Sequence, residues 1–374
     1  RSDVSDEQNM VLMGFIGFLD PPKQSAAAAI TALNEHGVRV VVLTGDSEGV
    51  AVKVCSKVGV PTEHCLTGVD VEAMSDKALI RAVRECCLFS KLSPAQKQRV
   101  VAAFQANGHT VGYMGDGIND TLAMRQSDVG ISVDSAVDIA KETADIILLK
   151  KDLMVLEEGV LEGRRTFGNI MKYIKMAASG NFGNMISVVL ASILLPFLPL
   201  KPVQILTQNL LCDFAQLGIP FDRVDESYLS QPRKWDTGSI QKFMFSMGPL
   251  SCIFDLCCYA ILWWAMGANT MEHAALFQCG NFVYGTLSQI LVVHMIRTEK
   301  IPFAQSRPAA FLMATTLLFS ALTLGIGFSG FAAYLDMAAL PLAFLPWLLL
   351  LLAGYCLGVQ LIKRFYKRAY GYWL

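Results

Sequence analysis

Charged side chains are scarce in this 374-residue chain: Asp, Glu, Lys and Arg make up 17% of it, while 53% of the residues are apolar. A soluble protein carries about 25% charged residues, so this composition excludes a wholly soluble enzyme and a disordered chain. The net charge of −1 excludes a nucleic-acid binder, which would show a basic face, so we expect no nucleic-acid partner. Part of the chain is therefore expected to lie in a membrane.

Two further signals are missing. The ten cysteines form no C-x-x-C pair and have no histidine at zinc-ligand spacing, which gives no support for a structural zinc site. The sequence begins at Arg1 rather than at Met and has no signal peptide. We therefore expect it to be a piece of a longer chain.

The scarce charge is unevenly distributed. Residues 1–169 hold 17 basic and 23 acidic side chains, whereas residues 170–374 hold 14 basic and 9 acidic ones. The first part predicts an acidic globular domain. The second contains six apolar runs near the 20 or so residues that a membrane span needs, at roughly 178–197, 203–221, 243–266, 277–296, 309–330 and 341–362. The second run is weakened by polar residues and is kept because an odd number of spans would conflict with the loop charges.

Those loop charges predict the orientation of the spans. The loops 222–242 and 297–308 and the tail from Lys363 hold eleven Lys and Arg residues, and the opposite loops hold only Lys201. Because basic residues prefer the cytoplasm, the globular domain and the C-terminus are predicted to be cytoplasmic.

Polar side chains occur as pairs in the first two spans. Asn181 and Asn184 are three residues apart, and Asn209 and Asp213 are four apart, so each pair shares one helix face. A short Pro-rich connection makes the two spans antiparallel neighbours whose polar faces can meet. Amide and carboxylate oxygens suit a hard cation, although such residues also simply join helices. The quartet favours an ion site.

Two other polar residues lie within the predicted spans. Asp255 has no partner that the sequence identifies, and a structural or a functional role is equally open. His294 is near the cytoplasmic end of its span and is predicted to be interfacial.

The first part alternates apolar runs with amphipathic stretches, which is typical of a Rossmann-type parallel sheet covered by helices on both faces. The predicted strands are 11–19, 38–43, 86–89, 110–114, 129–133 and 145–149. The predicted helices are 23–36, 48–58, 75–85, 94–106, 118–127 and 136–143. In such sheets ligands bind at the carboxyl ends of the strands.

Three polar clusters fall at those ends: Thr44-Gly45-Asp46, Lys97 in SPAQKQRVV, and Asp116 with Asp120 in a Gly-rich turn. A hydroxyl with adjacent backbone amides can bind phosphate oxygens, and a lysine can neutralise charge on a transferring phosphoryl group. Two carboxylates can hold Mg²⁺. Each cluster alone has a simpler explanation, a turn or a solvated lysine. The three clusters together, in this order, are a specific signal for a site that binds phosphate and Mg²⁺.

The segments FLDPPK (18–23), LTGDS (43–47), LSPAQKQRVV (92–101) and MGDGINDTLAM (114–124) resemble the second half of the phosphorylation domain of P-type ATPases. The six runs match that family's last six membrane helices, so the resemblance covers essentially the whole chain. It implies a haloacid-dehalogenase-like domain over residues 1–160, a stalk helix over 152–176 and an all-α membrane domain over 177–374. It also implies that Thr44, Gly45 and Asp46 contact phosphate or ATP, that Lys97 stabilises the acyl phosphate, and that Asp116 binds catalytic Mg²⁺ with support from Asn119 and Asp120.

The family's phosphorylated aspartate lies in a D-K-T-G-T motif, which this sequence lacks. The resemblance therefore implies that the nucleotide-binding and actuator domains and four membrane helices lie upstream, and that this chain alone cannot form the phosphoenzyme. GNFGNMISVVLAS and QILTQNLLCDFAQLGIPFDRVD are similar to bacterial magnesium-transporting ATPases. This similarity implies Mg²⁺ import across the bacterial inner membrane, with lipid as a partner and Asn181, Asn184, Asn209 and Asp213 as ligands of the carried ion.

Other functions stay open at this point. A pump of the same family could carry Ca²⁺ or a monovalent ion. A membrane-tethered phosphatase of the haloacid-dehalogenase class would need a D-x-D-x-[TV] nucleophile motif, which follows no predicted strand. A non-catalytic membrane fragment would leave the GDGIND turn unexplained.

Overall fold

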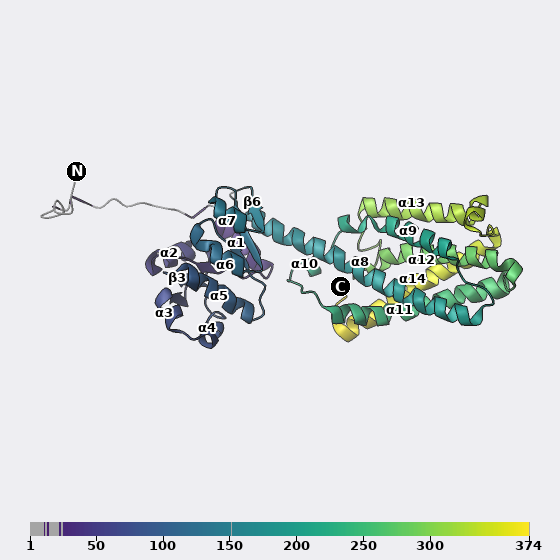
Figure 1. Ribbon diagram of the computed structural model, residues 1–374, viewed down its shortest axis with the longest axis horizontal. Coiled ribbons are helices and arrows are strands. Elements are labelled where there is room, and N and C mark those ends of the chain that lie inside the picture. Colours follow the sequence, from purple (N-terminus) through teal and green to yellow (C-terminus); the bar gives the residue numbers. More distant parts are fainter. Residues whose placement is uncertain (1–10, 12, 15–21, 24, 151, 374) are drawn as a thin grey trace. The chain divides into compact units, whose positions relative to one another are not determined.

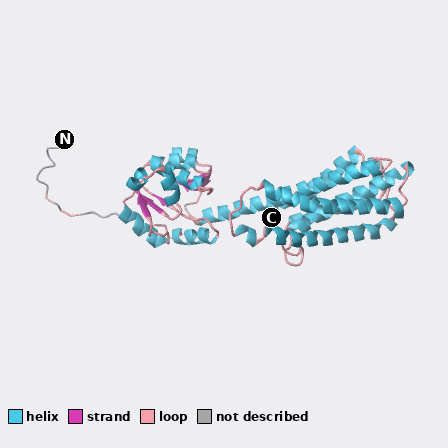
Figure 2. Ribbon diagram, turned by 90° about the horizontal axis from the view of Figure 1, so that it is seen from below, coloured by secondary structure: helices cyan, strands magenta, loops and turns pink. Residues whose placement is uncertain are grey.

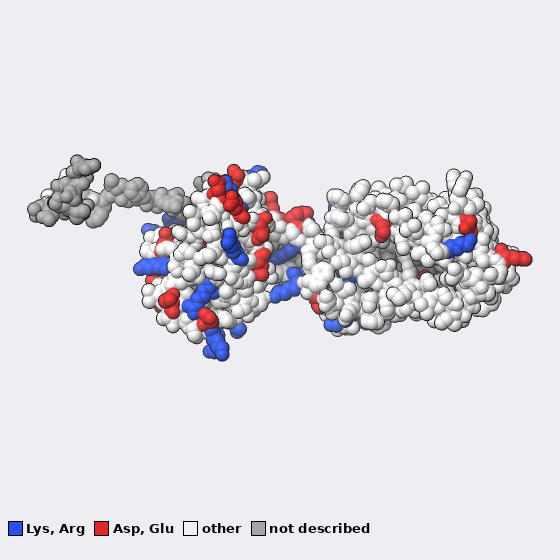
Figure 3. Space-filling model, viewed as in Figure 1, with Lys and Arg blue, Asp and Glu red and all other residues white. Residues whose placement is uncertain are grey.

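The structure is a computed structural model that describes residues 11, 13–14, 22–23, 25–150 and 152–373. It divides into two compact units, Arg1–Gly159 and Val160–Leu374 (Figure 1). Figure 2 shows the strands gathered in the first unit, while the second is drawn almost entirely as helix. Charged side chains are dense on the visible face of the first unit and sparse on that of the second (Figure 3).

The first unit holds two three-stranded parallel sheets, ordered β1-β3-β2 and β4-β5-β6. The strands are β1 (Val42–Leu43), β2 (Cys65–Thr67), β3 (Leu88–Ser90), β4 (Gly112–Met114), β5 (Val129–Val133) and β6 (Ile146–Leu148). The parallel arrangement is confirmed; among the described residues the strands form two sheets, and β1 pairs with β3 alone. The predicted strand 11–19 lies mostly outside the described residues.

The helices of this unit are α1 (Ala26–Glu35), α2 (Glu48–Val58), α3 (Gly68–Ala73), α4 (Asp76–Ala82), α5 (Pro94–Ala106), the 3₁₀ turn Ile118–Asp120, α6 (Thr121–Gln126) and α7 (Asp138–Thr143). α5 begins where the sequence places its start. Pro94 occupies the first turn, and Ser93 and Gln96 each accept a hydrogen bond from the other's backbone N–H.

α5 packs against both sheets. Its Val100 belongs to the core cluster that contains Phe89 of β3, and its Val101 belongs to the cluster that contains Tyr113 of β4. Both valines are fully buried. Lys97 lies one turn before them, so this packing fixes where its side chain points.

The second unit contains α8 (Met154–Leu194), which begins within the first, followed by α9 (Pro202–Gln216), the 3₁₀ turn Ile219–Phe221, α10 (Glu226–Leu229), α11 (Thr237–Ala260), the π-helical turn Ile261–Ala265, α12 (Ala274–Ile296), α13 (Ala310–Gly327) and α14 (Leu345–Tyr370). Short 3₁₀ turns precede α12 and flank the α13–α14 connection, at Met271–His273, Gly330–Leu335 and Leu342–Phe344. α12 is central and packs against α9, α11, α13 and α14 (Figure 1). In its most apolar window 89% of the residues are buried.

Within the described residues, five helices are long and apolar enough to cross a membrane: Met154–Leu194, Thr237–Ala265, Met271–Ile296, Ala310–Gly327 and Leu342–Tyr370. The predicted span 203–221 is not among them. It forms α9, whose 15 residues cover about 22 Å, short of the roughly 30 Å hydrocarbon core. The chain turns at Gly218, where a Cβ would lie 2.3 Å from Leu312 Cα, so only glycine fits that close approach. The six-span count stays a prediction.

Candidate functional site

A lysine, an aspartate and a tyrosine meet at the end of β4. Lys97 Nζ lies 2.8 Å from Asp120 Oδ1, and their side chains are only 11% and 15% exposed. The Tyr113 hydroxyl donates to the same oxygen at 2.8 Å. Burial raises the pKa of Tyr113, and the neighbouring Asp120 carboxylate raises it further, so this hydroxyl stays protonated as a donor. The group holds the lysine ammonium in one position.

The turn after β4 requires glycine at one position. A Cβ on Gly115 would lie 2.4 Å from Asp120 Cβ and 2.8 Å from its Cγ, whereas a Cβ on Gly117 would meet nothing closer than 3.8 Å. Gly115 is anchored to β5, because its N–H donates to Ile131 O and its carbonyl accepts from the Ser132 hydroxyl, each at 3.0 Å. Asp120 can therefore fold back over Gly115 toward Lys97.

Asp116 is placed differently from Asp120. It is exposed, and its carbonyl accepts from Val137 N at 3.1 Å, while its carboxylate makes no hydrogen bond in the described part of the chain. A free carboxylate at the carboxyl end of a parallel strand suits a Mg²⁺ ligand. Asn119 is exposed on the same turn, and Asp120 keeps one oxygen, Oδ2, beyond its bonds to Lys97 and Tyr113. The donor set therefore fits Mg²⁺.

Thr44, Gly45 and Asp46 form the turn after β1. The Thr44 hydroxyl donates to Asp46 Oδ2 at 2.9 Å and accepts from Asp46 N at 3.0 Å. The carbonyls of Asp46 and Thr44 accept from the backbone of Lys91 and Leu92. Because the preceding Leu43 packs into the Tyr113 cluster, this turn follows a strand that contacts the β4 side of the unit. None of the described hydrogen bonds joins the turn to Lys97 or Asp120.

The structure does not bring the four membrane candidates together through hydrogen bonds among its described residues. Asn181, Asn209 and Asp213 are exposed and Asn184 is half-buried. α9 instead turns another face into the bundle, formed by Gln204, Gln208, Cys212 and Ala215. The polar residues that weakened the predicted span therefore divide into packing residues and exposed candidates.

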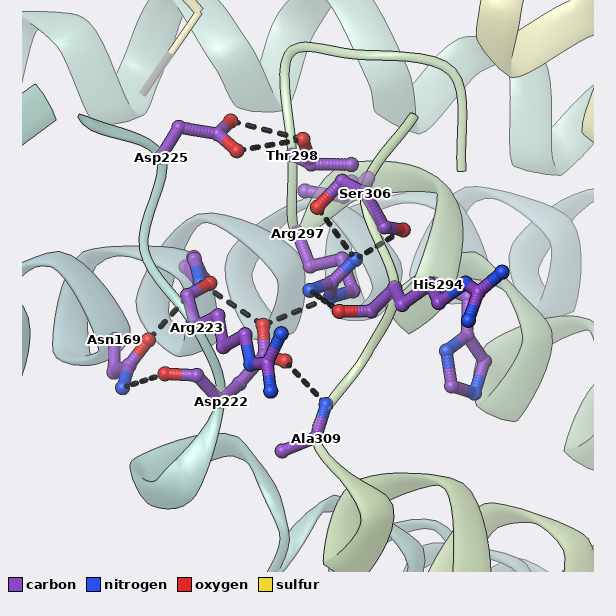
Figure 4. Close-up of polar contacts among 12 residues, drawn as sticks. Asn169, Asp222, Arg223, Asp225, His294, Arg297, Thr298, Ser306 and Ala309 are labelled. Carbon is purple, nitrogen blue, oxygen red and sulfur yellow. Dashed lines mark hydrogen bonds and ion pairs between the residues drawn. The ribbon is translucent and has the colours of Figure 1, made fainter. Parts of the chain in front are cut away.

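A buried ion cluster, centred on Asp222, went unnoticed in the sequence (Figure 4). Asp222 Oδ2 lies 3.0 Å from Lys172 Nζ and 2.8 Å from Arg297 Nε, and Oδ1 accepts from Ala309 N at 3.1 Å. The three charged side chains are 1–3% exposed. Burial opposes the Asp222 charge, but the hydrogen bond from Arg297 and the charge of Lys172 outweigh it and lower its pKa.

The Asp222 cluster joins α8, the segment after α9, the end of α12 and the start of α13. Arg297 also donates to Ser306 O at 3.1 Å and to Arg307 O at 3.0 Å, and Lys172 donates to Arg223 O at 2.8 Å. Sequence spacing gives no signal for it, since the partners lie 50 and 75 residues apart. Arg297, one of the eleven loop charges counted in the sequence, lies buried in this cluster.

His294 is buried within the helix bundle at the end of α12. It is 4% exposed, and its Nε2 lies 2.9 Å from Thr316 Oγ1 of α13 (Figure 4). Its position at the membrane interface stays a prediction.

Two protein-family models and several curated proteins match this chain. Residues 3–128 match the haloacid dehalogenase-like hydrolase family, and residues 197–365 match the family described as cation transporting ATPase, C-terminus. The chain is 53% identical over 367 residues to "Magnesium-transporting ATPase, P-type 1" of Salmonella typhimurium (strain LT2), covering 98% of this chain and 41% of that protein. The protein of the same name in Escherichia coli (strain K12) is 51% identical over 368 residues, with the same coverage.

A more distant relative is "Endoplasmic reticulum calcium ATPase srcA" of Aspergillus fumigatus, which is 33% identical over 238 residues, or 62% of this chain and 24% of that protein. The chain spans about two-fifths of the length of the curated magnesium-transporting relatives that it matches.

Proposed function

We propose that this chain, which belongs to the P-type ATPase family, is part of an ATP-driven pump that carries Mg²⁺ across the bacterial inner membrane into the cytoplasm. The observation that carries the proposal is the buried Lys97–Asp120 pair beside the exposed carboxylate of Asp116, together with five candidate membrane helices among the described residues. The first unit and the C-terminus would face the cytoplasm, and α9 with the turn Ile219–Phe221 would complete a sixth pass.

Lys97 and the Thr44–Asp46 turn would bind the phosphoryl group. The Lys97 ammonium, held by Asp120 and Tyr113, offers a fixed positive charge to the anionic phosphoryl oxygens. The backbone N–H of the exposed Gly45 offers a hydrogen-bond donor to ATP or phosphate, and the Thr44 hydroxyl would donate to it in place of Asp46 Oδ2. The aspartate that accepts the phosphoryl group belongs to the rest of the pump, because the sequence contains no D-K-T-G-T motif.

Asp116 would hold the Mg²⁺ of Mg-ATP, with Asp120 Oδ2 and Asn119 beside it. That ion neutralises phosphate charge when bound. Asp120 would thus have two tasks, because its Oδ1 holds Lys97 while its Oδ2 stays available.

The carried Mg²⁺ would bind Asn181, Asn184, Asn209 and Asp213. Three amides and one carboxylate carry little negative charge, which suits an ion that keeps part of its water shell. The exposed Asn181, Asn209 and Asp213 would be open to the helices that the rest of the pump would supply, and Asn184 is half-buried. The alternative is that the pump carries Ca²⁺ instead of Mg²⁺, which the 33% identity with the calcium ATPase supports.

The test is ATP hydrolysis by the complete purified pump in lipid, with Mg²⁺, Ca²⁺, Na⁺ and K⁺ compared as the transported ion. We expect an acid-stable phosphoenzyme and stimulation by Mg²⁺. Asp213→Asn should abolish that stimulation, whereas Asp336→Asn, which removes an exposed acid beside Lys201, should not. Stimulation by Ca²⁺ alone, or full Mg²⁺ stimulation in the Asp213 variant, would overturn the ion assignment.

A further inference from the structure

Asp255 is an acid inside α11 that the proposed pump cycle does not use. Asp255 is 5% exposed, and it forms no ion pair in the described part of the chain. The partner that the sequence could not identify is Ser187 of α8, whose hydroxyl oxygen lies 2.5 Å from Asp255 Oδ2. Two helices far apart in the sequence are joined by this one contact between polar side chains.

The two helices approach closely on the same side. A Cβ on Gly183 would lie 2.8 Å from Gly248 O and 2.8 Å from Ser251 Cβ, so α8 and α11 touch through small residues. Ser187 lies one turn beyond Gly183, and Asp255 one turn beyond Ser251. The contact between Ser187 and Asp255 therefore continues a tight helix–helix seam.

The Ser187 hydroxyl makes two contacts but has a single hydrogen, which indicates which group donates in each contact. Its oxygen lies 3.0 Å from Gly183 O as well as 2.5 Å from Asp255 Oδ2. A hydroxyl carries one hydrogen and can donate to only one of these oxygens. Each contact has a hydrogen of its own only when the carboxyl is protonated and donates to Ser187, which then donates to Gly183; an ionised carboxylate would have to share the one hydroxyl hydrogen with Gly183 O.

The surroundings of Asp255 also disfavour a charge. The titratable groups that interact with it are one thiol and three phenols, from α11 itself, α12 and α14: Cys258, Tyr259, Tyr284 and Tyr355. α8 contributes no titratable residue between 177 and 194. A buried carboxylate without a cation is costly, so a bound proton is the cheapest means of neutralising it.

We propose that Asp255 is a proton-binding site of the membrane unit, and that the bound proton makes the hydrogen bond that ties α11 to α8. The proton comes from water and binds Oδ2. On its release to water the carboxylate accepts the hydrogen of Ser187, and Gly183 O loses that bond. Protonation therefore switches the hydrogen-bond direction at the seam, and the O–H bond at Oδ2 is the one covalent bond that forms and breaks.

The site has a consequence for transport, which rests on the proposed pump function. Ser187 lies three residues after Asn184, so it sits about one turn from a proposed ligand of the carried ion. A movement of α8 away from α11 would deprive the charged carboxylate of the Ser187 hydroxyl as its hydrogen-bond donor and so favour the bound proton. Movement of α8 and proton uptake at Asp255 would then be linked.

The test is infrared spectroscopy of the complete pump in lipid at pH 7. Exposed carboxyls are ionised there, since the usual Asp pKa is about 3.9, so a carboxylic-acid band reports buried protonated groups. We expect the band of the wild type to lose one component in Asp255→Asn, whose amide can still donate to Ser187. In Asp336→Asn, the exposed-acid control, the band should be unchanged.

Ser187→Ala keeps the acid and removes its acceptor, so the Asp255 component should shift rather than vanish. If Asp255→Asn does not fold, the carboxylic-acid band of Ser187→Ala tests the proton site by itself. A carboxylic-acid band that is identical in the wild type, Asp255→Asn and Ser187→Ala would overturn the proton site. The spectra need no transport, so they separate failure of this inference from failure of the pump proposal.

Discussion

Lys97 of α5 and Asp120 of the turn after β4 form an ion pair whose Nζ–Oδ1 distance is 2.8 Å and whose side chains are 11% and 15% exposed. An ion pair this shielded from water is weakened little by salt, and loss of one partner leaves the other charge uncompensated. Asp120 is thus a positioning residue for the lysine, and Tyr113 restrains the same oxygen from a second direction.

Asp120→Asn is expected to slow phosphoryl transfer in the complete pump by about 10²-fold, the loss typical of a displaced stabilising group. The amide cannot neutralise the Lys97 charge, so the ammonium would leave its position toward solvent. Tyr113→Phe removes one hydrogen bond but keeps the ion pair, and its effect should be clearly smaller. The measurement is the rate of phosphoenzyme formation at saturating ATP, and equal losses in both variants would contradict the assigned roles.

Gly115→Ala should impair the same step for a steric reason. The new methyl group would lie 2.4 Å from Asp120 Cβ and would push that side chain away from Lys97. Gly117→Ala, two residues on in the same turn, meets nothing closer than 3.8 Å and is the matched control. ATP hydrolysis should fall at least about tenfold in the first variant and stay near wild type in the second. Similar activity of the two would show that the close approach is unimportant.

Local signals predicted part of the fold accurately. α2 and α5 coincide with the predicted ranges, and Ser93 and Pro94 mark the start of α5 unambiguously. β2 and α3 went unnoticed, although Thr67 and Asp70 form a capping box that the T-x-x-D spacing could have revealed. β2 has only three residues, too few to give a periodic apolar pattern.

The same holds for the site residues: motifs contiguous in the sequence were predictable, and contacts between residues far apart in the sequence were not. That Thr44–Asp46 and Asp116 directly follow strands was predictable from the apolar runs before them, and their binding roles stay predictions. Tyr113 was missed because nothing in TVGYM says that its hydroxyl reaches Asp120, and Asp222 was missed because its partners are set by the packing of several helices. α9 ends at Gln216, before the predicted span 203–221 does, and the close approach of Gly218 to Leu312 just after it leaves no signal in the sequence.

Asp222→Asn is expected to destabilise the second unit by about 3–5 kcal/mol, since it leaves Lys172 and Arg297 buried without a counter-charge. Glu299→Gln is the control. Its pair with Lys367, at 2.9 Å, is 28% and 41% exposed, and such pairs contribute about 0–1 kcal/mol. Denaturation of the complete pump in detergent measures both changes, and a loss in the Asp222 variant no larger than in the control would argue against a buried cluster.

The Asp222 cluster should also make stability depend on acid pH with a defined sign. The pKa of Asp222 is lowered in the folded protein, because Arg297 and Lys172 outweigh the effect of burial, while an unfolded Asp has a pKa of about 3.9. The folded state thus binds this proton less readily, so the contribution is fully present well above pH 4 and is lost as the pH falls through the folded pKa. The stability difference between the wild type and Asp222→Asn should accordingly be constant from pH 8 to 6 and shrink on further acidification, as measured by thermal unfolding at a series of pH values. A difference that grows as the pH falls would mean that Asp222 is protonated in the native cluster.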